Sequence, residues 1–453
     1  MRCLCIFALT LASISPTAAR ADGIPSAFDP RIVEIVAASS AERVGADIET
    51  LASFGTRHTL SDTTSSTRGI GAARRWIRSE FERISADCGG CLEVIEQWML
   101  VEGGEHDRIP EDTWIVNEIA ILRGSEYPDR YVIMSGDIDS RVSDPNTFVD
   151  DSPGANDNAS GMAGVLEAAR LLSRHRFAKS IVFAGLSGEE QGLFGGQHMA
   201  ARALEENWEI EAVLNNDMIG NIAGVDGVID NRGFRIFSEA VSMLEDERAR
   251  TRRRYFGGEI DGPSRQVARF VDETTRRYFH DLQPMLIYRL DRFGRGGHHR
   301  PFNDAGFPGV RIMESHENYT RQHQDLRTEN GIDYGDVLSG VDFDYAARLT
   351  AVNAAALASL AWAGAAPTEV TILGAVEPAA ELTWNRAPGS AILGYEIVWR
   401  LTTEPRWTNS RFVGDVESHV LTGLVVDNYL FGVRSVATNG QRGVVVFPEA
   451  GRR

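Results

Sequence analysis

The sequence predicts an α/β domain in three layers, with a mixed, largely parallel sheet between helices, followed by a smaller all-β sandwich. Short apolar runs separated by helix-like segments predict the first domain, because buried strands of such sheets are typically continuous apolar runs. Each run also leads into acidic residues. The runs are Tyr131–Met134, Ile181–Leu186 and Glu211–Leu214.

The rest of the larger domain follows from the same patterns, taken in chain order. Apolar residues recur at helical spacing from residue 28 to 54 and again from Ile70 to Ile84. Leu92–Val101 and Asn117–Leu122 alternate like strands, and we expect them to form a hairpin. Further helices are predicted at residues 160–172, 199–204, 235–256, 263–279 and 341–362, and short strands at 285–288 and 310–313.

The composition changes after residue 364, and we place the domain boundary there. From Ala365 to the end, short alternating segments are separated by turn residues, which is typical of a β-sandwich. Trp384 and Tyr429 resemble the core tryptophan and the corner tyrosine of a fibronectin type III domain. We therefore predict a larger domain at residues 22–364 and a fibronectin type III-like domain at residues 365–453.

The N-terminal residues 1–21 predict a secretory signal. Arg2 is the basic start, Leu4–Ile14 is the apolar core, and Ala19-Arg20-Ala21 is a cleavage site of the small-x-small type. The apolar core is too short to span a bilayer, and we expect no membrane span elsewhere. The mature chain is then expected to begin at Asp22 and to be periplasmic or secreted.

The charge of the chain limits its partners. A formal net charge of −18 argues against nucleic acid or an anionic membrane surface as the ligand. An acidic molecule favours substrates that carry a free amino group.

Two of the four cysteines, Cys88 and Cys91, lie outside the predicted signal, in the segment CGGC. In an oxidising compartment we expect them to form a local disulfide, with a redox-active pair as the alternative. Without the signal only this pair remains, which is too few for a four-cysteine zinc site.

Five acidic residues follow the predicted strands or the Gly-rich turns beside them. In α/β sheets ligands bind beyond the carboxyl ends of the strands, so these side chains should meet at one edge. Ionised carboxylates a few ångströms apart repel one another strongly, and bound metal ions are the economical way to hold them together. The five residues are Asp137, Asp157, Glu189, Glu190 and Asp217.

Three segments, GANDNASG, SGEEQGLFGG and NNDMIG, carry a resemblance across roughly residues 40–362. In this order and spacing they resemble the two-zinc aminopeptidases of metallopeptidase clan MH, family twenty-eight, which includes bacterial leucyl aminopeptidase, aminopeptidase Y and glutamate carboxypeptidase. The resemblance implies a three-layer phosphorylase/hydrolase-like fold and two divalent metal ions, zinc above all.

The resemblance also implies a role for each matching residue. Asp157 would bridge the two ions, Glu190 would bind one and Asp217 the other, and Glu189 would be the general base. The late loop ENYTRQHQD offers His323 as the remaining ligand, with His316 as the rival. His299, in the HHRPF segment, would match a histidine that lines the substrate pocket.

The chain departs from the family pattern at Asp137, where the family has a histidine ligand in a His-x-Asp pair. Asp139 takes the second position, which normally orients that histidine. In one reading Asp137 still binds, and the site of Asp137, Asp157 and Asp217 is all-oxygen, which favours manganese or magnesium beside zinc. In the other reading Asp137 points away and that site is weak or empty. We favour the first; Arg141 could pair with Asp137 or Asp139.

These residues predict a metal-dependent aminopeptidase that hydrolyses N-terminal peptide bonds with a water activated by two ions. A carboxypeptidase of the same family is one alternative, because arginines cluster near His299, although we favour a solvated basic loop as their explanation. A single-zinc acyltransferase like the glutaminyl cyclases is another. A non-catalytic binding protein is a third, which Glu189 argues against. The sandwich is expected to aid attachment to a surface or polymer or to cover one side of the larger domain. The arginines are Arg292, Arg295, Arg300 and Arg311.

Overall fold

The computed structural model describes residues 26–389 and 391–450. The predicted signal at residues 1–21 lies outside these ranges. Within them, no helix combines the length and the apolar character that crossing a membrane requires.

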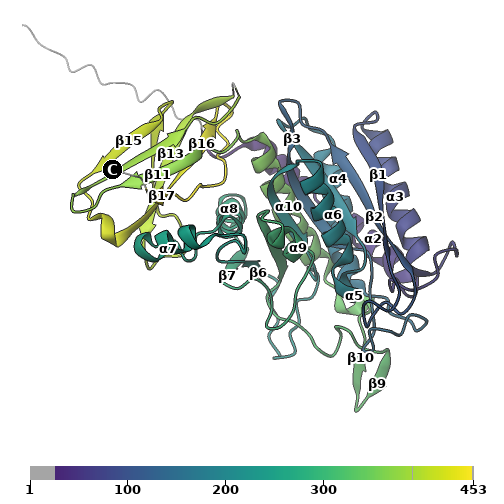
Figure 1. The fold of residues 1–453 in the computed structure, drawn as a ribbon. Coiled ribbons are helices and arrows are strands. Elements are labelled where there is room, and N and C mark those ends of the chain that lie inside the picture. The colour runs from purple at the N-terminus through teal and green to yellow at the C-terminus, as the bar shows by residue number, and fades with distance from the viewer. Residues whose placement is uncertain (1–25, 390, 451–453) are drawn as a thin grey trace, which may run out of the picture.

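An eight-stranded sheet forms the centre of the larger domain, with the strand order β1-β2-β4-β3-β5-β8-β6-β7 (Figure 1). Strands β4, β3, β5 and β8 run parallel, whereas β2 is antiparallel to β4 and β6 is antiparallel to β8. The predicted mixed, largely parallel sheet is confirmed. Its strands are β1 (Leu92–Val101), β2 (Thr113–Leu122), β3 (Tyr127–Asp137), β4 (Lys179–Leu186), β5 (Glu209–Asn216), β6 (Gly233–Ser238), β7 (Gln283–Ile287) and β8 (Gly309–Glu314).

Helices cover both faces of this sheet, which gives the predicted three layers (Figure 1). On β3, Val132 and Met134 pack into the core that contains α4 and α10, whereas Tyr131 and Ile133 pack into the core that contains α6 and α9. This alternation follows the two-residue period of a strand. The helices are α1 (Pro30–Ala38), α2 (Ala41–Ser53), α3 (Gly69–Asp87), α4 (Gly161–Leu172), α5 (Glu189–Gly192), α6 (Phe194–Glu205), α7 (Glu247–Phe256), α8 (Pro263–Tyr278), α9 (His299–Asp304) and α10 (Phe343–Trp362), with the short helical turns η1 (Ala155–Ser160), η2 (Leu338–Gly340) and η3 (Val426–Asn428).

The segment after β5 differs from its prediction. The sequence predicts one charged helix from residue 235 to 256, but the structure has strand β6 followed by the shorter helix α7. Phe234 and Ile236 are buried in the core of the domain, and the strand pairs with β7 and β8. The alternation in GFRIFS is a strand pattern, and the charged residues that follow it obscure it.

The C-terminal part is all-β, as predicted. A four-stranded sheet, β15-β12-β11-β17, and a three-stranded sheet, β14-β13-β16, contribute to one core around Trp384, Tyr395 and Phe431. Helix α10 ends at Trp362 and β11 begins at Thr368, on either side of the predicted boundary. The remaining strands are β9 (Arg327–Glu329), β10 (Ile332–Tyr334), β11 (Thr368–Leu373), β12 (Ala379–Asn385), β13 (Ile392–Leu401), β14 (Asn409–Gly414), β15 (Ser418–Thr422), β16 (Tyr429–Ala437) and β17 (Glu449–Ala450).

The sandwich is joined to the larger domain by ion pairs. Arg400 of β13 places Nη2 at 2.8 Å from both oxygens of Asp261, and neither side chain is exposed. Arg434 of β16 pairs with Glu273 of α8 at 2.8 Å. Removing one partner of the buried Arg400–Asp261 pair would leave an uncompensated charge. Both contacts lie in α8 or just before it, where the sandwich meets the larger domain.

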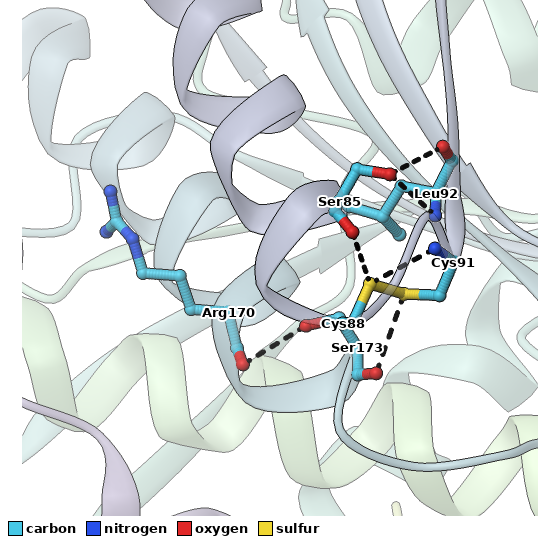
Figure 2. Close-up of a disulfide and its surroundings, with 6 residues drawn as sticks. All are labelled: Ser85, Cys88, Cys91, Leu92, Arg170 and Ser173. Atoms are coloured by element: carbon cyan, nitrogen blue, oxygen red, sulfur yellow. Dashed lines mark hydrogen bonds between the residues drawn. A yellow bond between two sulfur atoms is a disulfide. The ribbon is translucent and has the colours of Figure 1, made fainter.

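Cys88 and Cys91 form a disulfide at the turn between α3 and β1 (Figure 2). Beside it, the hydroxyl of Ser85 donates to the carbonyl of Leu92 at 2.9 Å and accepts from the Leu92 amide at 3.2 Å. The disulfide and these hydrogen bonds join the end of α3 to β1, the first strand of the sheet. This position indicates a structural role for the disulfide.

Candidate metal centre

The acidic residues predicted at the sheet edge do meet at the carboxyl ends of three neighbouring strands. Asp137 is the last residue of β3, Glu189 and Glu190 follow β4 in α5, and Asp217 follows β5. Four of the five predicted acids line a cavity of about 240 Å³ there. The fifth, Asp137, is buried and is not among the lining residues.

Asp157, Glu190 and His323 form the tightest group in the cavity. His323 Nε2 lies 2.9 Å from Asp157 Oδ2 and 3.0 Å from Glu190 Oε1, and the three ligand atoms all lie within 4.8 Å of one another. Imidazole nitrogen and carboxylate oxygen both bind zinc, and three protein ligands leave a fourth position for water or substrate, as in catalytic zinc sites. This group fits a divalent ion.

Opposite charges dominate the electrostatics of this group. Burial lowers the pKa of His323, but Glu190 and Asp157 raise it overall, to about 9. Burial raises the pKa of Asp157, yet the hydrogen bond and charge of His323 bring it well below its usual range. Arg141 donates to Glu190 Oε2 at 2.7 Å and lies 2.6 Å from His323 Nδ1. Since an ion on Nε2 leaves the ring proton on Nδ1, Arg141 must turn from Nδ1 when metal binds.

Asp157 is held in place by a residue that the sequence analysis missed. The carboxylate of Asp336 accepts from the backbone amide of Asp157 at 2.6 Å and from that of Asn156 at 2.9 Å. Asp336 is buried and lies 179 residues later in the chain. No local motif marks it, because its role depends on the fold bringing the loop before η2 against η1.

Asp139 orients the glutamate pair. Its Oδ1 accepts from the Glu189 amide at 3.2 Å, and its Oδ2 accepts from the Glu190 amide at 3.1 Å. Thr59 donates to the same Oδ2 at 3.0 Å. Asp139 therefore supports the start of α5 and positions Glu190. The sequence pattern instead places it behind residue 137, as the residue that would orient a ligand there.

Asp137 lies outside the group and has its own partners. Its Oδ1 lies 2.6 Å from His298 Nδ1, and its Oδ2 accepts from Asn158 Nδ2 at 2.7 Å. All three side chains are buried. Both carboxylate oxygens of Asp137 are thus engaged within the protein.

Asp217 faces a guanidinium. Arg311 of β8 lies with Nη2 2.8 Å from Asp217 Oδ2, and its Nη1 lies 3.3 Å from Asp291 Oδ2. Arg311 has no exposed surface. Burial lowers its pKa, but Asp217 and Asp291 raise it overall, so the guanidinium stays charged. Burial raises the pKa of Asp217 and Arg311 opposes that rise; at this distance we take the pair to be ionic.

Comparison with known proteins now assigns the family. The model of "Peptidase family M28" matches residues 117–338. A protein of Leptosphaeria maculans named "Probable zinc metalloprotease" is 43% identical over 421 residues, which cover 93% of this chain and 96% of the relative. A protein of Pyrenophora tritici-repentis with the same name is 41% identical, over 94% of this chain and 89% of the relative. The chain belongs to peptidase family M28.

Solved structures agree with this M28 fold. LapB from Legionella pneumophila superposes with a TM-score of 0.53 at 16% identity, covering 75% of this chain and 79% of that one. The Legionella pneumophila LapA aminopeptidase superposes with a TM-score of 0.52 at 16% identity, covering 79% of this chain and 80% of that one.

The histidines of this M28 chain separate clearly. Of the two rivals in the late loop, His323 lies in the group with Asp157 and Glu190, whereas His316 pairs with Asp226 at 2.8 Å elsewhere. His299 does not line the cavity: it is fully buried, with Nε2 2.9 Å from the Leu290 carbonyl oxygen. Its neighbour His298 is the one that contacts a predicted ligand, Asp137.

Arginines also form a large part of the cavity wall, and two of the predicted cluster, Arg292 and Arg311, are not part of a solvated loop. Arg292 is only 9% exposed, and Arg311 behind it is fully buried. Arg141, expected near Asp137 or Asp139, pairs instead with Glu190. The arginines that line the cavity are Arg108, Arg141, Arg292, Arg295 and Arg300.

Proposed function

We propose that this chain is a zinc-dependent exopeptidase that removes N-terminal residues from peptides. The observation that carries the proposal is the group of Asp157, Glu190 and His323 with Glu189 beside it in one cavity. The names of the fungal relatives, with zinc and protease activity, and of the LapA aminopeptidase support it.

A zinc ion held by Asp157, Glu190 and His323 would polarise the scissile carbonyl and acidify an attacking water. Glu189 is the carboxylate placed to take the proton from that water and to pass it to the leaving amine. Burial and the charges of Glu190 and Asp217 raise the pKa of Glu189, which suits a group that must hold a proton between the two steps. Asp139 keeps the pair oriented through the two backbone amides.

A carboxypeptidase of the same family is a second candidate, which the arginines of the cavity favour. Arg292, Arg295 and Arg300 all line it, and the Nε of Arg300 is buried without a hydrogen-bond partner. A guanidinium is well suited to bind the terminal carboxylate of a peptide through two hydrogen bonds. The single-zinc acyltransferase remains a third candidate, because the group of three ligands needs only one ion.

One set of peptides separates these candidates. Zinc-loaded protein is incubated with each of four peptides, and the products are followed by mass spectrometry. The four are a peptide with both termini free, its N-acetylated form, its C-amidated form, and a peptide that begins with glutamine. An aminopeptidase shortens the free and amidated peptides from the N-terminus and leaves the acetylated one intact. Shortening of the acetylated peptide from its C-terminus would replace the proposal by the carboxypeptidase, and loss of ammonia from the glutamine peptide would replace it by the cyclase.

We further propose that the protein is periplasmic or secreted and that the sandwich can attach it to a surface or polymer. The signal pattern of residues 1–21 and the disulfide between Cys88 and Cys91 support the first part. Fractionation of cells that express the full chain tests it. A mature protein that stays with the cytoplasm and retains residues 1–21 would contradict it.

A further inference from the structure

The carboxylates predicted to hold a second ion do not share a site. Both oxygens of Asp137 are engaged, one by His298 and one by Asn158. Asp217 presents Oδ2 to Arg311 at 2.8 Å, and its Oδ1 is buried without a hydrogen-bond partner. An ion between Asp157 and Asp217 would find one free oxygen of Asp217 and none of Asp137. Among the described residues, three ligand atoms converge at Asp157, Glu190 and His323, and no such group includes Asp217. The carboxylates on the Asp217 side therefore do not by themselves complete a second metal site.

Arg311 reaches Asp217 through the sheet itself. Strand β8 lies beside β5, with Arg311 opposite Asn215 in the parallel register, so that its side chain extends toward the residue that follows β5. Two further contacts fix the guanidinium, because Nη1 donates to the Gly296 carbonyl at 2.8 Å and faces Asp291. The positive charge is thus a fixed part of the fold, buried behind the cavity.

Arg292 adds to the same charge. It lines the cavity, is 9% exposed, and bonds the same Asp291 and Gly296 that Arg311 contacts. Two guanidinium groups therefore lie on the Asp217 side of the site, whereas the Asp157 side presents three converging ligand atoms.

We propose that Arg311 supplies, from within the chain, the positive charge at Asp217 that a second metal ion would otherwise supply, so that the centre holds one divalent ion at Asp157, Glu190 and His323. The inference deepens the proposed function and rests on it for the presence of the first ion. Asp137 is then a partner of His298 and Asn158 that shapes the floor of the site.

Zinc content tests this without reference to activity. The mature full-length chain is stripped with chelator, reloaded with excess zinc, desalted, and measured for zinc per folded chain by mass spectrometry. We expect one zinc for the wild type, none for His323→Ala, and one for Asp217→Asn, because Asp217 is neutralised by Arg311 and holds no ion. Two zinc ions in the wild type, with one lost in Asp217→Asn, would overturn the inference.

Arg311→Met tests the cause. Removing the guanidinium frees Asp217, so the zinc content should rise from one toward two at high zinc, whereas Arg311→Lys should keep it at one. Arg265→Met is the matched control, since Arg265 is also buried but its Nη2 donates to the Ser238 carbonyl and its guanidinium lies over the Tyr288 ring. A folded Arg311→Met protein that still holds one zinc would overturn the role of Arg311. If that variant does not fold, the wild-type and Asp217→Asn counts decide. Peptide hydrolysis is assayed separately, so a protein with one zinc and no hydrolysis would sink the proposed function and leave the count standing.

Discussion

The two sides of the cavity contain the same residue types in opposite arrangements. On one side His323 stands between two carboxylates, Asp157 and Glu190, in a geometry that a cation can replace. On the other side, Asp137 lies behind the cavity wall with both oxygens engaged by His298 and Asn158, and Asp217 gives one oxygen to Arg311 while its second oxygen has no hydrogen-bond partner. Acidic residues at a sheet edge therefore do not by themselves define a metal site. What decides is whether several ligand atoms converge on one point, as they do at Asp157, Glu190 and His323.

The histidines show the same contrast. The pKa of His323 is raised to about 9 by its carboxylate neighbours, against the effect of burial, whereas burial lowers the pKa of His298 to about 4. On the first side, neighbouring carboxylates favour the charged form of His323. On the second, burial keeps the His298 imidazole neutral. The predictions below separate the two sides, beginning with the largest effect.

Removal of a ligand on the first side should have the largest effect. His323→Ala should lose zinc and reduce peptide hydrolysis by roughly a thousandfold or more, since the ion supplies most of the activation of water and carbonyl. His316→Ala is the matched control, and it should retain both zinc and rate. Zinc content and initial rates on one peptide provide the measurement. Normal zinc content in His323→Ala would show that the ion lies elsewhere.

Glu189→Gln should separate binding from chemistry. The variant keeps Asp157, Glu190 and His323, so its zinc content should not change, while the loss of the general base lowers the rate by about 10² to 10⁴. Glu93→Gln is a control on β1, where Glu93 pairs with Arg123 at the surface. A rate within a few fold of the wild type in Glu189→Gln would assign the base to another residue.

Arg311→Met probes the second side through stability. Its loss leaves Asp217 buried without its guanidinium and leaves Asp291 with Arg292 as its remaining guanidinium partner, which should cost about 3–5 kcal/mol in the free energy of unfolding. Arg265→Met should cost less, since its guanidinium contacts neutral groups: two backbone carbonyl groups and the Tyr288 ring. Urea unfolding of both variants without zinc makes the comparison, and equal losses would mean that Arg311 matters only as a packed side chain.

Replacing His299 should give the smallest effect, which is seen only as a change in how stability depends on pH. Burial lowers its pKa to about 4 from 6.5. A depressed pKa gives stability that is present above pH 6.5 and lost as the pH falls toward 4, because the unfolded state takes up the proton first. Between pH 7 and 4 the wild type should lose on the order of 3 kcal/mol that His299→Phe does not lose. Urea unfolding at both pH values tests this, and a constant difference between the two proteins would refute it.

Much of the fold and half of the site could be predicted from the sequence. The buried strands β3, β4 and β5 are continuous apolar runs, and their periodicity needs no tertiary information. Asp157, Glu190 and His323 lie in local motifs. Arg311, Asp336 and His298 do not, because their roles arise from register between strands and from loops that meet only in the folded chain. Strand β6 is short and precedes a charged helix, so its alternation was hidden by composition.

The most direct test is a crystal of the zinc-loaded chain with diffraction data collected on both sides of the zinc absorption edge. The account predicts one anomalous peak, between Asp157, Glu190 and His323, with Arg141 turned from His323 Nδ1 and Arg311 still paired with Asp217. A second peak between Asp157 and Asp217, with Arg311 displaced and Asp137 turned onto the ion, would contradict it and restore the two-ion centre that the sequence predicts.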